Sequence, residues 1–358
     1  MTCNQFHKFS NIQCSTIRTL KLLICLSGLA SISPVFAAEK EQIIEDCHAK
    51  FKRNNVALAF PICTQAAELG DAAAQYNLGT MHDLGEVTPK DIKQALNWYA
   101  KSAAQDFAPA QYSLGVMYEY GDGTAKDLKL AFNWYSKAAQ QGYPEAQYNL
   151  GRLYVSGQGT PRNDVKAFEW YSKAAEEGNA EAQYNLGFMY YNGKGTPEDD
   201  KKSVYWYTKA AEQKIAIAQY NLAIMYDNGR GTAKDHKQAL YWYEQAAEQG
   251  EALAQYNLAY MYQHARGTSK NDKKAFNWYT KAAQLGYAKA QLNLGLLYAM
   301  GEGTNPDDIK AYAWLDLAAM QGNELAINNK EILENRMTPG QKVNGLNLSK
   351  EYSEKYAK

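Results

Sequence analysis

All seven tryptophans of this 358-residue chain lie 36 residues apart. They are Trp98, Trp134, Trp170, Trp206, Trp242, Trp278 and Trp314. Seven glutamines keep the same spacing: Gln75, Gln111, Gln147, Gln183, Gln219, Gln255 and Gln291. A fixed period of this length predicts that one supersecondary unit has been copied along the chain and that the copies stack as a solenoid. We therefore expect the function on a long surface rather than in a single pocket.

Each copy has the pattern of a helix hairpin. In the unit that starts at Gln111, Leu114 and Met117 share one face of a first helix, and Gly121 and Gly123 predict a tight connection after it. The second helix carries the tryptophan, which we expect to fill the space between neighbouring repeats. Seven residues before each tryptophan stands an Asp or Asn, the residue types that cap a helix start: Asp91, Asp127, Asn163, Asp199, Asp235, Asn271 and Asp307.

Residues 1–37 have the layout of a secretory signal peptide. Three basic residues and no acidic residue accompany an apolar run from Leu22 to Phe36, and small residues follow at Ala37 and Ala38. We expect cleavage near Ala37 and a periplasmic or secreted chain without a membrane span after cleavage. A retained membrane anchor is the alternative, although glycine, serine and proline interrupt the apolar run.

The remaining chain divides into a capping half-repeat, seven repeats and C-terminal capping helices, at residues 38–74, 75–326 and 327–358. Without the leader it carries 35 basic and 38 acidic side chains. A nearly neutral solenoid without a basic stripe argues against a nucleic-acid partner. Two of the five cysteines remain, Cys47 and Cys63. In an exported chain an even pair predicts a disulfide, here within the N-terminal cap, and two free buried thiols are the alternative.

One repeat carries a combination of short motifs that is specific to a known family. It reads Ala146-Gln-Tyr-Asn-Leu-Gly151, Tyr154-x-x-Gly157-x-Gly159, Lys166-Ala167-x-x-Trp170-Tyr171, Ala174-Ala175 and Gly178. This pattern resembles the Sel1-like repeat, which is similar to the tetratricopeptide repeat. The resemblance implies an all-α, right-handed α/α solenoid whose first helices line a concave groove. It also implies an adaptor that gathers other proteins, in exported bacterial members often in envelope processes or host-cell contact.

No catalytic constellation emerges from the sequence. The histidines beyond the leader are isolated and show no metal-ligand spacing, and the serine β-lactamase motifs Ser-x-x-Lys and Lys-Thr-Gly are missing. We therefore predict a chain that is not an enzyme and that needs no cofactor or metal. Two alternatives stay open. Some exported, cysteine-rich relatives are described as binding or hydrolysing β-lactams, which keeps an enzyme among them. One is a β-lactam or peptidoglycan hydrolase, and the other is a structural envelope protein that binds a glycan such as peptidoglycan.

The candidate binding surface consists of two rows of side chains on the first helices, three residues apart in each copy. The polar row is nearly constant: Asn77, Ser113, Asn149, Asn185, Asn221, Asn257 and Asn293. The variable row changes from copy to copy: Thr80, Val116, Arg152, Phe188, Ile224, Tyr260 and Leu296.

A fixed amide beside a changing neighbour suits peptide binding, because the amide holds a partner's backbone while the variable side chain reads its sequence. We expect partner contacts from the four central copies, at Asn149, Arg152, Asn185, Phe188, Asn221, Ile224, Asn257 and Tyr260. Phe188, Ile224 and Tyr260 would form the apolar centre. In the alternative reading, each Asn bonds the backbone of the adjacent repeat and only sets the stacking angle.

Overall fold

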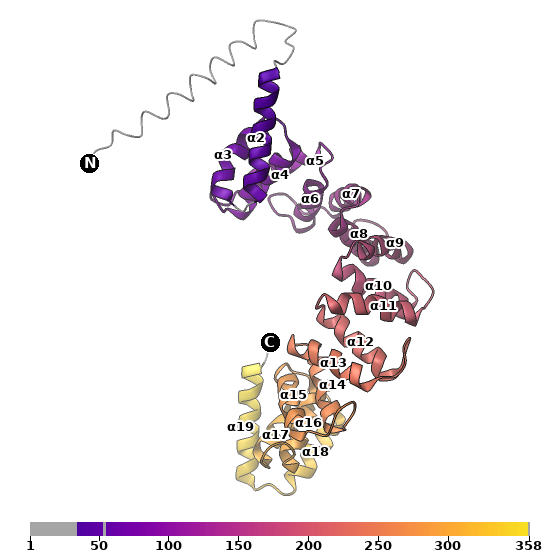
Figure 1. Cartoon of the computed structure of the whole chain (residues 1–358). Helices are drawn as coiled ribbons and strands as arrows, with labels where there is room; N and C mark the ends of the chain where they lie inside the picture. Colours follow the sequence, from indigo (N-terminus) through magenta and orange to yellow (C-terminus); the bar gives the residue numbers. More distant parts are fainter. Residues whose placement is uncertain (1–33, 53–54, 357–358) are drawn as a thin grey trace, which may run out of the picture. The chain divides into compact units, whose positions relative to one another are not determined.

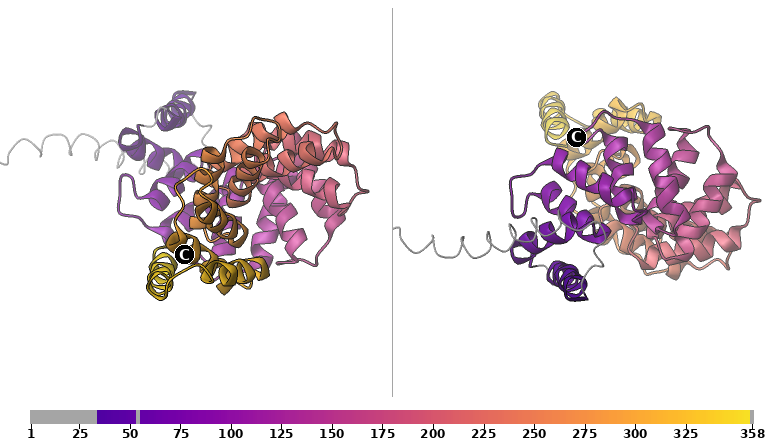
Figure 2. Two further views of the ribbon diagram at one scale, coloured as in Figure 1. Left: turned by 90° about the horizontal axis from the view of Figure 1, so that it is seen from below. Right: turned by 90° about the horizontal axis from the view of Figure 1, so that it is seen from above.

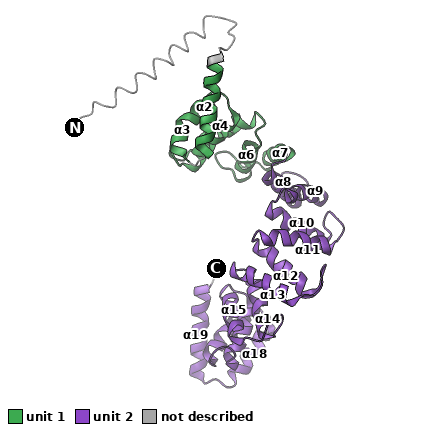
Figure 3. Cartoon of the chain, in the orientation of Figure 1, with its two compact units in different colours: residues 1–141 green, residues 142–358 purple. Residues whose placement is uncertain are grey.

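The computed structural model describes residues 34–52 and 55–356, in which all regular secondary structure is helical (Figure 1). Residues 1–33 of the predicted signal peptide lie outside the described part of the chain. The chain divides into two compact units, residues 1–141 and 142–358 (Figure 3). Within each unit successive helices pack as antiparallel hairpins, one hairpin per repeat, and two further views in Figure 2 show the same order of hairpins.

Unit 1 contains the N-terminal cap and two repeats. Its helices are α2 (Pro34–Lys52), α3 (Val56–Glu68), α4 (Ala72–Leu84), α5 (Ile92–Ala103), α6 (Ala108–Tyr120) and α7 (Leu128–Gln140).

Unit 2 contains the remaining repeats and the C-terminal cap. Its helices are α8 (Pro144–Ser156), α9 (Asp164–Glu176), α10 (Ala180–Asn192), α11 (Asp200–Glu212), α12 (Ala216–Asn228), α13 (His236–Glu248), α14 (Ala252–Gln263), α15 (Asp272–Gln284), α16 (Ala288–Met300), α17 (Asp308–Met320), α18 (Glu324–Glu334) and α19 (Pro339–Tyr356). In both units the even-numbered helices α4–α16 are the predicted first helices.

The predicted capping residues all start a second helix. Each of the seven accepts a hydrogen bond from a backbone N–H of the first turn, as Asp199 does from Lys202 at 3.0 Å. The glycines in the turns that connect the two helices of a repeat are required for different reasons. Gly193 ends α10 in the left-handed region at φ 62°. A Cβ at Gly231 would collide with the backbone carbonyl of Asp200 in the preceding repeat, so this position cannot carry a side chain if the repeats are to stack.

In six of the seven repeats tyrosine, rather than tryptophan, supplies the most deeply buried ring. The residue after the tryptophan is at most 3 % exposed in six copies: Tyr99, Tyr135, Tyr171, Tyr207, Tyr243 and Tyr279. Trp134 packs against an apolar cluster formed by α5 of the preceding repeat and α6 of its own, as expected for an inter-repeat residue, but it is only half-buried. The ammonium of Lys137 lies 4.3 Å from its ring centroid and covers its outer face. Only Trp314, among the seven, is buried.

The glutamine row has a structural role that spacing alone does not reveal. The Gln219 amide donates to the Ala211 carbonyl of the preceding repeat at 3.0 Å, and its oxygen accepts from Gln249 of its own repeat at 2.7 Å. The donor to the preceding repeat's carbonyl recurs at Gln75, Gln111, Gln183, Gln255 and Gln291. These amides satisfy the last carbonyls of one second helix from inside the next repeat, and thereby fix the stacking.

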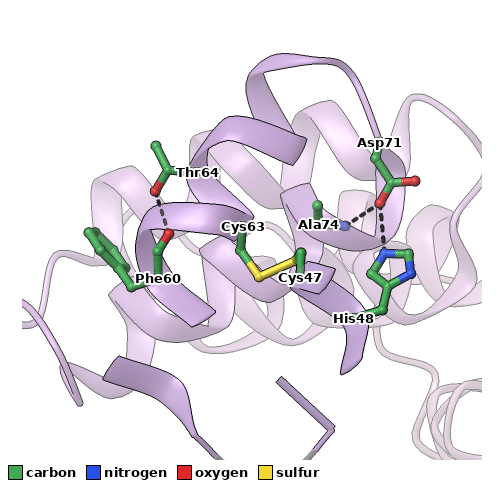
Figure 4. The surroundings of a disulfide bond; sticks show 7 residues. All are labelled: Cys47, His48, Phe60, Cys63, Thr64, Asp71 and Ala74. Carbon is green, nitrogen blue, oxygen red and sulfur yellow. Dashed lines mark hydrogen bonds and ion pairs between the residues drawn. A yellow bond between two sulfur atoms is a disulfide. The ribbon is translucent and has the colours of Figure 1, made fainter. Parts of the chain in front are cut away.

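The predicted disulfide is confirmed. Cys47 of α2 and Cys63 of α3 are bonded, and both side chains are fully buried (Figure 4). Beside the disulfide, His48 Nε2 lies 2.9 Å from Asp71 Oδ1, the carboxylate that also caps α4 by accepting from the Ala74 N–H. The N-terminal cap is thus tied covalently within itself and by hydrogen bonds to the first repeat.

The C-terminal cap covers the last second helix. Helix α19 packs along α17, where Tyr352 and Tyr356 lie on Trp314 with ring centroids 4.7 and 5.8 Å away. The Ser349 hydroxyl donates to the nearly buried Asp316 carboxylate at 2.6 Å. These contacts explain why Trp314 is buried while the tryptophans of the other repeats are not.

Candidate functional site

The eight predicted contact residues all belong to unit 2. They lie in pairs on the first helices α8, α10, α12 and α14, one member in the polar row and one in the variable row. All four asparagines are half-buried. The structure therefore places both rows on one helix series, and the environments of the two rows differ.

The polar row is partly engaged inside the protein. The side chain of Asn221 contacts the hydroxyls of Tyr184 and Tyr207, both in the preceding repeat. Burial raises the pKa of Tyr207, and hydrogen bonding to Asn221 partly offsets that rise. The same relationship recurs at the next two positions of the row, Asn257 and Asn293, with the tyrosines of their preceding repeats. These asparagines thus lie against tyrosine side chains of the preceding repeat, whereas the alternative considered from the sequence had them bond its backbone.

Asn185 makes a different contact. Its amide donates to the Glu181 carbonyl within the same helix at 2.9 Å. An amide has two donor hydrogens and a carbonyl oxygen with two lone pairs, so one internal hydrogen bond leaves capacity for a partner. The polar row is therefore compatible with both roles at once.

The variable row is more exposed. Phe188 and Tyr260 are each 36 % exposed, and Ile224 between them is half-buried against the apolar core. At the first position of the row in unit 2, Arg152 is half-buried and lies near Tyr171, where its positive charge lowers a tyrosine pKa that burial raises. Two large rings thus face solvent at addresses where the repeat fold does not require them.

A small pocket lies between α10 and α12. It has a volume of about 120 Å³ and is lined by Phe188, Tyr191, Asn192, Tyr207, Asn221 and Ile224. Three of these residues are predicted contacts, and the pocket brings members of both rows together. Liquid water takes about 30 Å³ per molecule, so the pocket has room for about four waters or one aliphatic side chain. Asn149, Arg152 and Tyr260 do not line it.

A row of cations in the turns after the first helices was missed from the sequence. Lys194, Arg230 and Arg266 occupy the same address in three successive repeats. The Lys194 ammonium lies 5.2 Å from the Phe188 ring, and the Arg266 guanidinium lies 5.8 Å from the Tyr260 ring. The 36-residue spacing of these three cations was the available signal.

Both rows also continue one copy further than predicted. Helix α18 carries Asn329 and Ile332, which lie 36 residues after Asn293 and Leu296. The Asn329 amide donates to the Leu325 carbonyl at 2.7 Å, as Asn185 does within α10, and Ile332 is 67 % exposed. Residues 327–358 were predicted to form capping helices because the repeat pattern is lost after Gly322, but α18 repeats the spacing of the polar and variable rows.

Comparison with known proteins identifies the repeat. A model of the Sel1 repeat family matches seven successive segments of the chain: 72–107, 108–143, 144–179, 180–214, 216–251, 252–287 and 288–323. The chain belongs to the Sel1 repeat family. Sel1 repeat proteins are generally adaptors in protein interactions and are generally non-catalytic.

One solved Sel1 repeat structure supports the same fold, and a second is similar in sequence. A Sel1 repeat protein from Oxalobacter formigenes is 31 % identical, with a TM-score of 0.61, and the match covers 87 % of this chain and 93 % of that one. A protective antigen of uropathogenic Escherichia coli with the same repeat fold is 30 % identical over 90 % of this chain and 86 % of its own, with a TM-score of 0.45.

Among curated proteins, a putative sel1-like repeat-containing protein of Acanthamoeba polyphaga mimivirus is 38 % identical over 71 residues. This match covers 20 % of the chain and spans about a tenth of the relative's length, 11 %. None of the helices within residues 34–52 and 55–356 combines the length and apolar character needed to cross a membrane.

Proposed function

We propose that this Sel1 repeat protein is a non-catalytic adaptor that binds a protein or peptide segment on the first-helix face of unit 2. The observation that carries the proposal is the exposed pair Phe188 and Tyr260 in the variable row, with the pocket of about 120 Å³ beside Phe188. Exposed aromatic rings next to a pocket are typical of the residues that dominate binding energy at protein interfaces.

The adaptor is proposed to act in the periplasm or outside the cell. The Cys47–Cys63 disulfide supports an oxidising compartment, and the predicted leader supports export. N-terminal sequencing of the protein recovered from fractionated cells tests this part. We expect the mature chain to begin after Ala37 and to be recovered outside the cytoplasm, and an uncleaved cytoplasmic chain would contradict it.

In-cell crosslinking tests the binding face. The wild-type chain is compared with the double variant Phe188→Ala/Tyr260→Ala. A matched control is Tyr205→Ala/Tyr241→Ala, which removes two exposed rings from the second helices, 54 % and 50 % exposed. We expect a defined protein to be captured by the wild type and by the control, but not by the Phe188/Tyr260 variant. Capture of the same proteins by all three chains would contradict the proposed face.

Two further assays address the alternatives. Turnover of a chromogenic β-lactam or release of peptidoglycan fragments by the pure chain would establish an enzyme. Retention on purified peptidoglycan after a high-salt wash, with no protein partner added, would favour glycan binding. The adaptor proposal expects no turnover, and expects retention only when a protein partner is present.

A further inference from the structure

Helix α19 packs along one face of α17, the last of the second helices. A Cβ atom at Gly345 would come within 2.7 Å of Tyr312 Cδ1, so the backbone of α19 lies directly on this ring. The Ser349 hydroxyl donates to the Asp316 carboxylate at 2.6 Å. Each of these two contacts joins residues 33 positions apart, so α19 runs parallel to α17. Two small residues thus let the two helices approach closely.

Two tyrosines complete the surface through which α19 contacts α17. Tyr352 and Tyr356 lie on the ring of Trp314. The four contact residues are spaced by four, three and four positions, which places them on one stripe of the helix: Gly345, Ser349, Tyr352 and Tyr356. Helix α19 therefore binds α17 through one stripe of small and aromatic side chains.

The corresponding face of α15, one repeat earlier, carries a pocket. The pocket has a volume of about 520 Å³ and is lined by α15 together with Glu244 of α13 and Tyr262 of α14. Three of its residues stand 36 positions before the residues that α19 contacts on α17: Phe276 before Tyr312, Trp278 before Trp314 and Thr280 before Asp316. In the described part of the chain, α15 has extensive contacts only with its sequence neighbours α14 and α16. We call this pocket the α15 groove.

The α15 groove differs from the face of α17 in its charge. Lys281 replaces Leu317, and its ammonium lies 3.8 Å from the centroid of the Trp278 ring. Two lysines and one glutamate line the groove, Lys274, Lys281 and Glu244, which leaves one excess positive charge. Lys281 is exposed and forms no ion pair with a described residue. An acidic group on an occupant would therefore gain a free counter-charge, and the cation–π contact of an exposed lysine is weak enough to give way.

Helix α19 also indicates where an occupant would carry this acidic group. Ser353 and Leu317 line one pocket of about 450 Å³, so Ser353 stands near the α17 residue that corresponds to Lys281. A glutamate at the place of Ser353 would meet Lys281 if the same helix lay on α15. The α19 of a second copy is a poorer occupant, because its serine offers Lys281 no charge and its tyrosines are already packed on Trp314.

We propose that the α15 groove binds an amphipathic helix of a partner protein, in the way that α17 binds α19. The stripe of this helix carries two small residues and then two aromatic residues at the spacing of α19, with an acidic residue at the place of Ser353. The groove lies on a second helix, apart from the two rows of the first helices, so it is a contact surface beyond the proposed function. Two separate surfaces let one chain hold two partners together.

Peptides derived from α19 test the proposal, with the full chain as the receptor. Four fluorescent peptides span residues 339–356: unsubstituted, Ser353→Glu, Ser353→Lys, and Ser353→Glu with Gly345→Leu. In fluorescence anisotropy, we expect the Ser353→Glu peptide to bind at least about fivefold more tightly than the Ser353→Lys peptide. Adding Gly345→Leu should weaken binding about tenfold, because the leucine would collide with Phe276, although leucine favours a helix more than glycine does.

A charge reversal in the groove locates the bound peptide. Lys281→Glu should reverse the preference, so that the Ser353→Lys peptide binds more tightly than the Ser353→Glu peptide. The matched control is Lys173→Glu at the same address of α9, where the ammonium lies 4.2 Å from the centroid of the Trp170 ring. This control should leave the preference unchanged. Both lysines are exposed, so neither substitution should alter the melting temperature.

Three other outcomes would overturn the proposal. The first is no binding by any peptide, or equal affinity for the two charge variants. The second is a preference that Lys281→Glu leaves unchanged or that Lys173→Glu also reverses. The third is an unsubstituted peptide that binds as tightly as the Ser353→Glu peptide, in the Lys281→Glu chain as well, which would indicate exchange of α19 with a second copy. Because these variants leave Phe188 and Tyr260 unchanged, the capture experiment on the first-helix face is decided separately.

Discussion

Gly187 lies directly beneath the ring of Tyr207. A Cβ atom at Gly187 would come within 2.7 Å of Tyr207 Cδ1, well inside normal contact distance. The first helix of a repeat thus leaves a notch that the buried tyrosine of its second helix fills. The same pairing joins Gly115 to Tyr135 and Gly151 to Tyr171. In two repeats the notch residue is alanine, Ala223 and Ala259, yet the facing tyrosines remain buried.

The alanine-containing repeats predict how the notch tolerates a larger residue. Gly187→Ala should change the free energy of unfolding by less than about 1 kcal/mol, since the better helix propensity of alanine offsets a small ring displacement. Gly187→Val should destabilise by about 2–3 kcal/mol through overpacking. Urea unfolding of both variants, with Ala223→Gly as the converse control, measures these differences. A Gly187→Val chain as stable as the wild type would mean that the notch does not constrain the ring.

The different burial of neighbouring rings predicts a ranking of two substitutions. Tyr207→Ala should destabilise by about 3–5 kcal/mol, because this ring is 2 % exposed. Trp206→Ala should lower the free energy of unfolding by less, about 1–3 kcal/mol, because Trp206 is only half-buried. Thermal and urea unfolding of the two variants compare them directly. A larger loss for Trp206→Ala would restore the view, taken from the sequence, that the tryptophans are the principal inter-repeat core.

The hydrogen bond between two glutamine side chains within a repeat, as between Gln249 and Gln219, is missing at Gln255. Gln255 Oε1 is buried without a hydrogen-bond partner, and the address that supplies Gln249 to Gln219 is occupied by Leu285. Leu285→Gln should add a donor and stabilise the chain by about 1 kcal/mol. The converse control, Gln249→Leu, should destabilise by a similar amount. Calorimetry on both variants checks the pair, and a destabilised Leu285→Gln chain would argue against the bridge.

The disulfide should stabilise the N-terminal cap specifically. It closes a sequence separation of 16 residues, for which loop closure predicts about 3 kcal/mol. Cys47→Ser/Cys63→Ser should therefore increase amide hydrogen exchange in α2 and α3 much more than in unit 2. Hydrogen exchange followed by mass spectrometry localises the change. Uniformly faster exchange through both units would contradict a local role.

Alkaline pH should loosen the C-terminal cap. Burial raises the pKa of Tyr352 to about 12 from an ordinary value of about 10. Because the folded state holds this proton more tightly, the contribution of Tyr352 is fully present below pH 10 and is lost as the pH rises toward 12. Stability between pH 10 and 12 should fall less steeply in Tyr352→Phe than in the wild type. Identical pH profiles would show that Tyr352 does not titrate with unfolding.

The sequence by itself determined the repeat, its helix starts and the disulfide. The repeat and its helix starts are periodic or local: a capping side chain such as Asp199 acts within one turn, and a 36-residue period gives each address the same place in its repeat. The disulfide followed from the even pair of cysteines. The same logic placed Phe188 and Tyr260 on one face. It did not reach Ile332, because the repeat pattern was taken to end after Gly322.

Only the tertiary structure decided which rings are buried and where the surface is hollowed. Trp206 and Tyr207 are adjacent apolar rings in the sequence, and their exposure depends on the notch at Gly187 that a different helix provides. The pocket beside Phe188 likewise needs α10, α11 and α12 together. The second role of Asn221, holding two tyrosines of the preceding repeat, follows from stacking in the same way. Periodicity assigns each residue an address, but burial and contacts at that address depend on the neighbouring repeat packed against it.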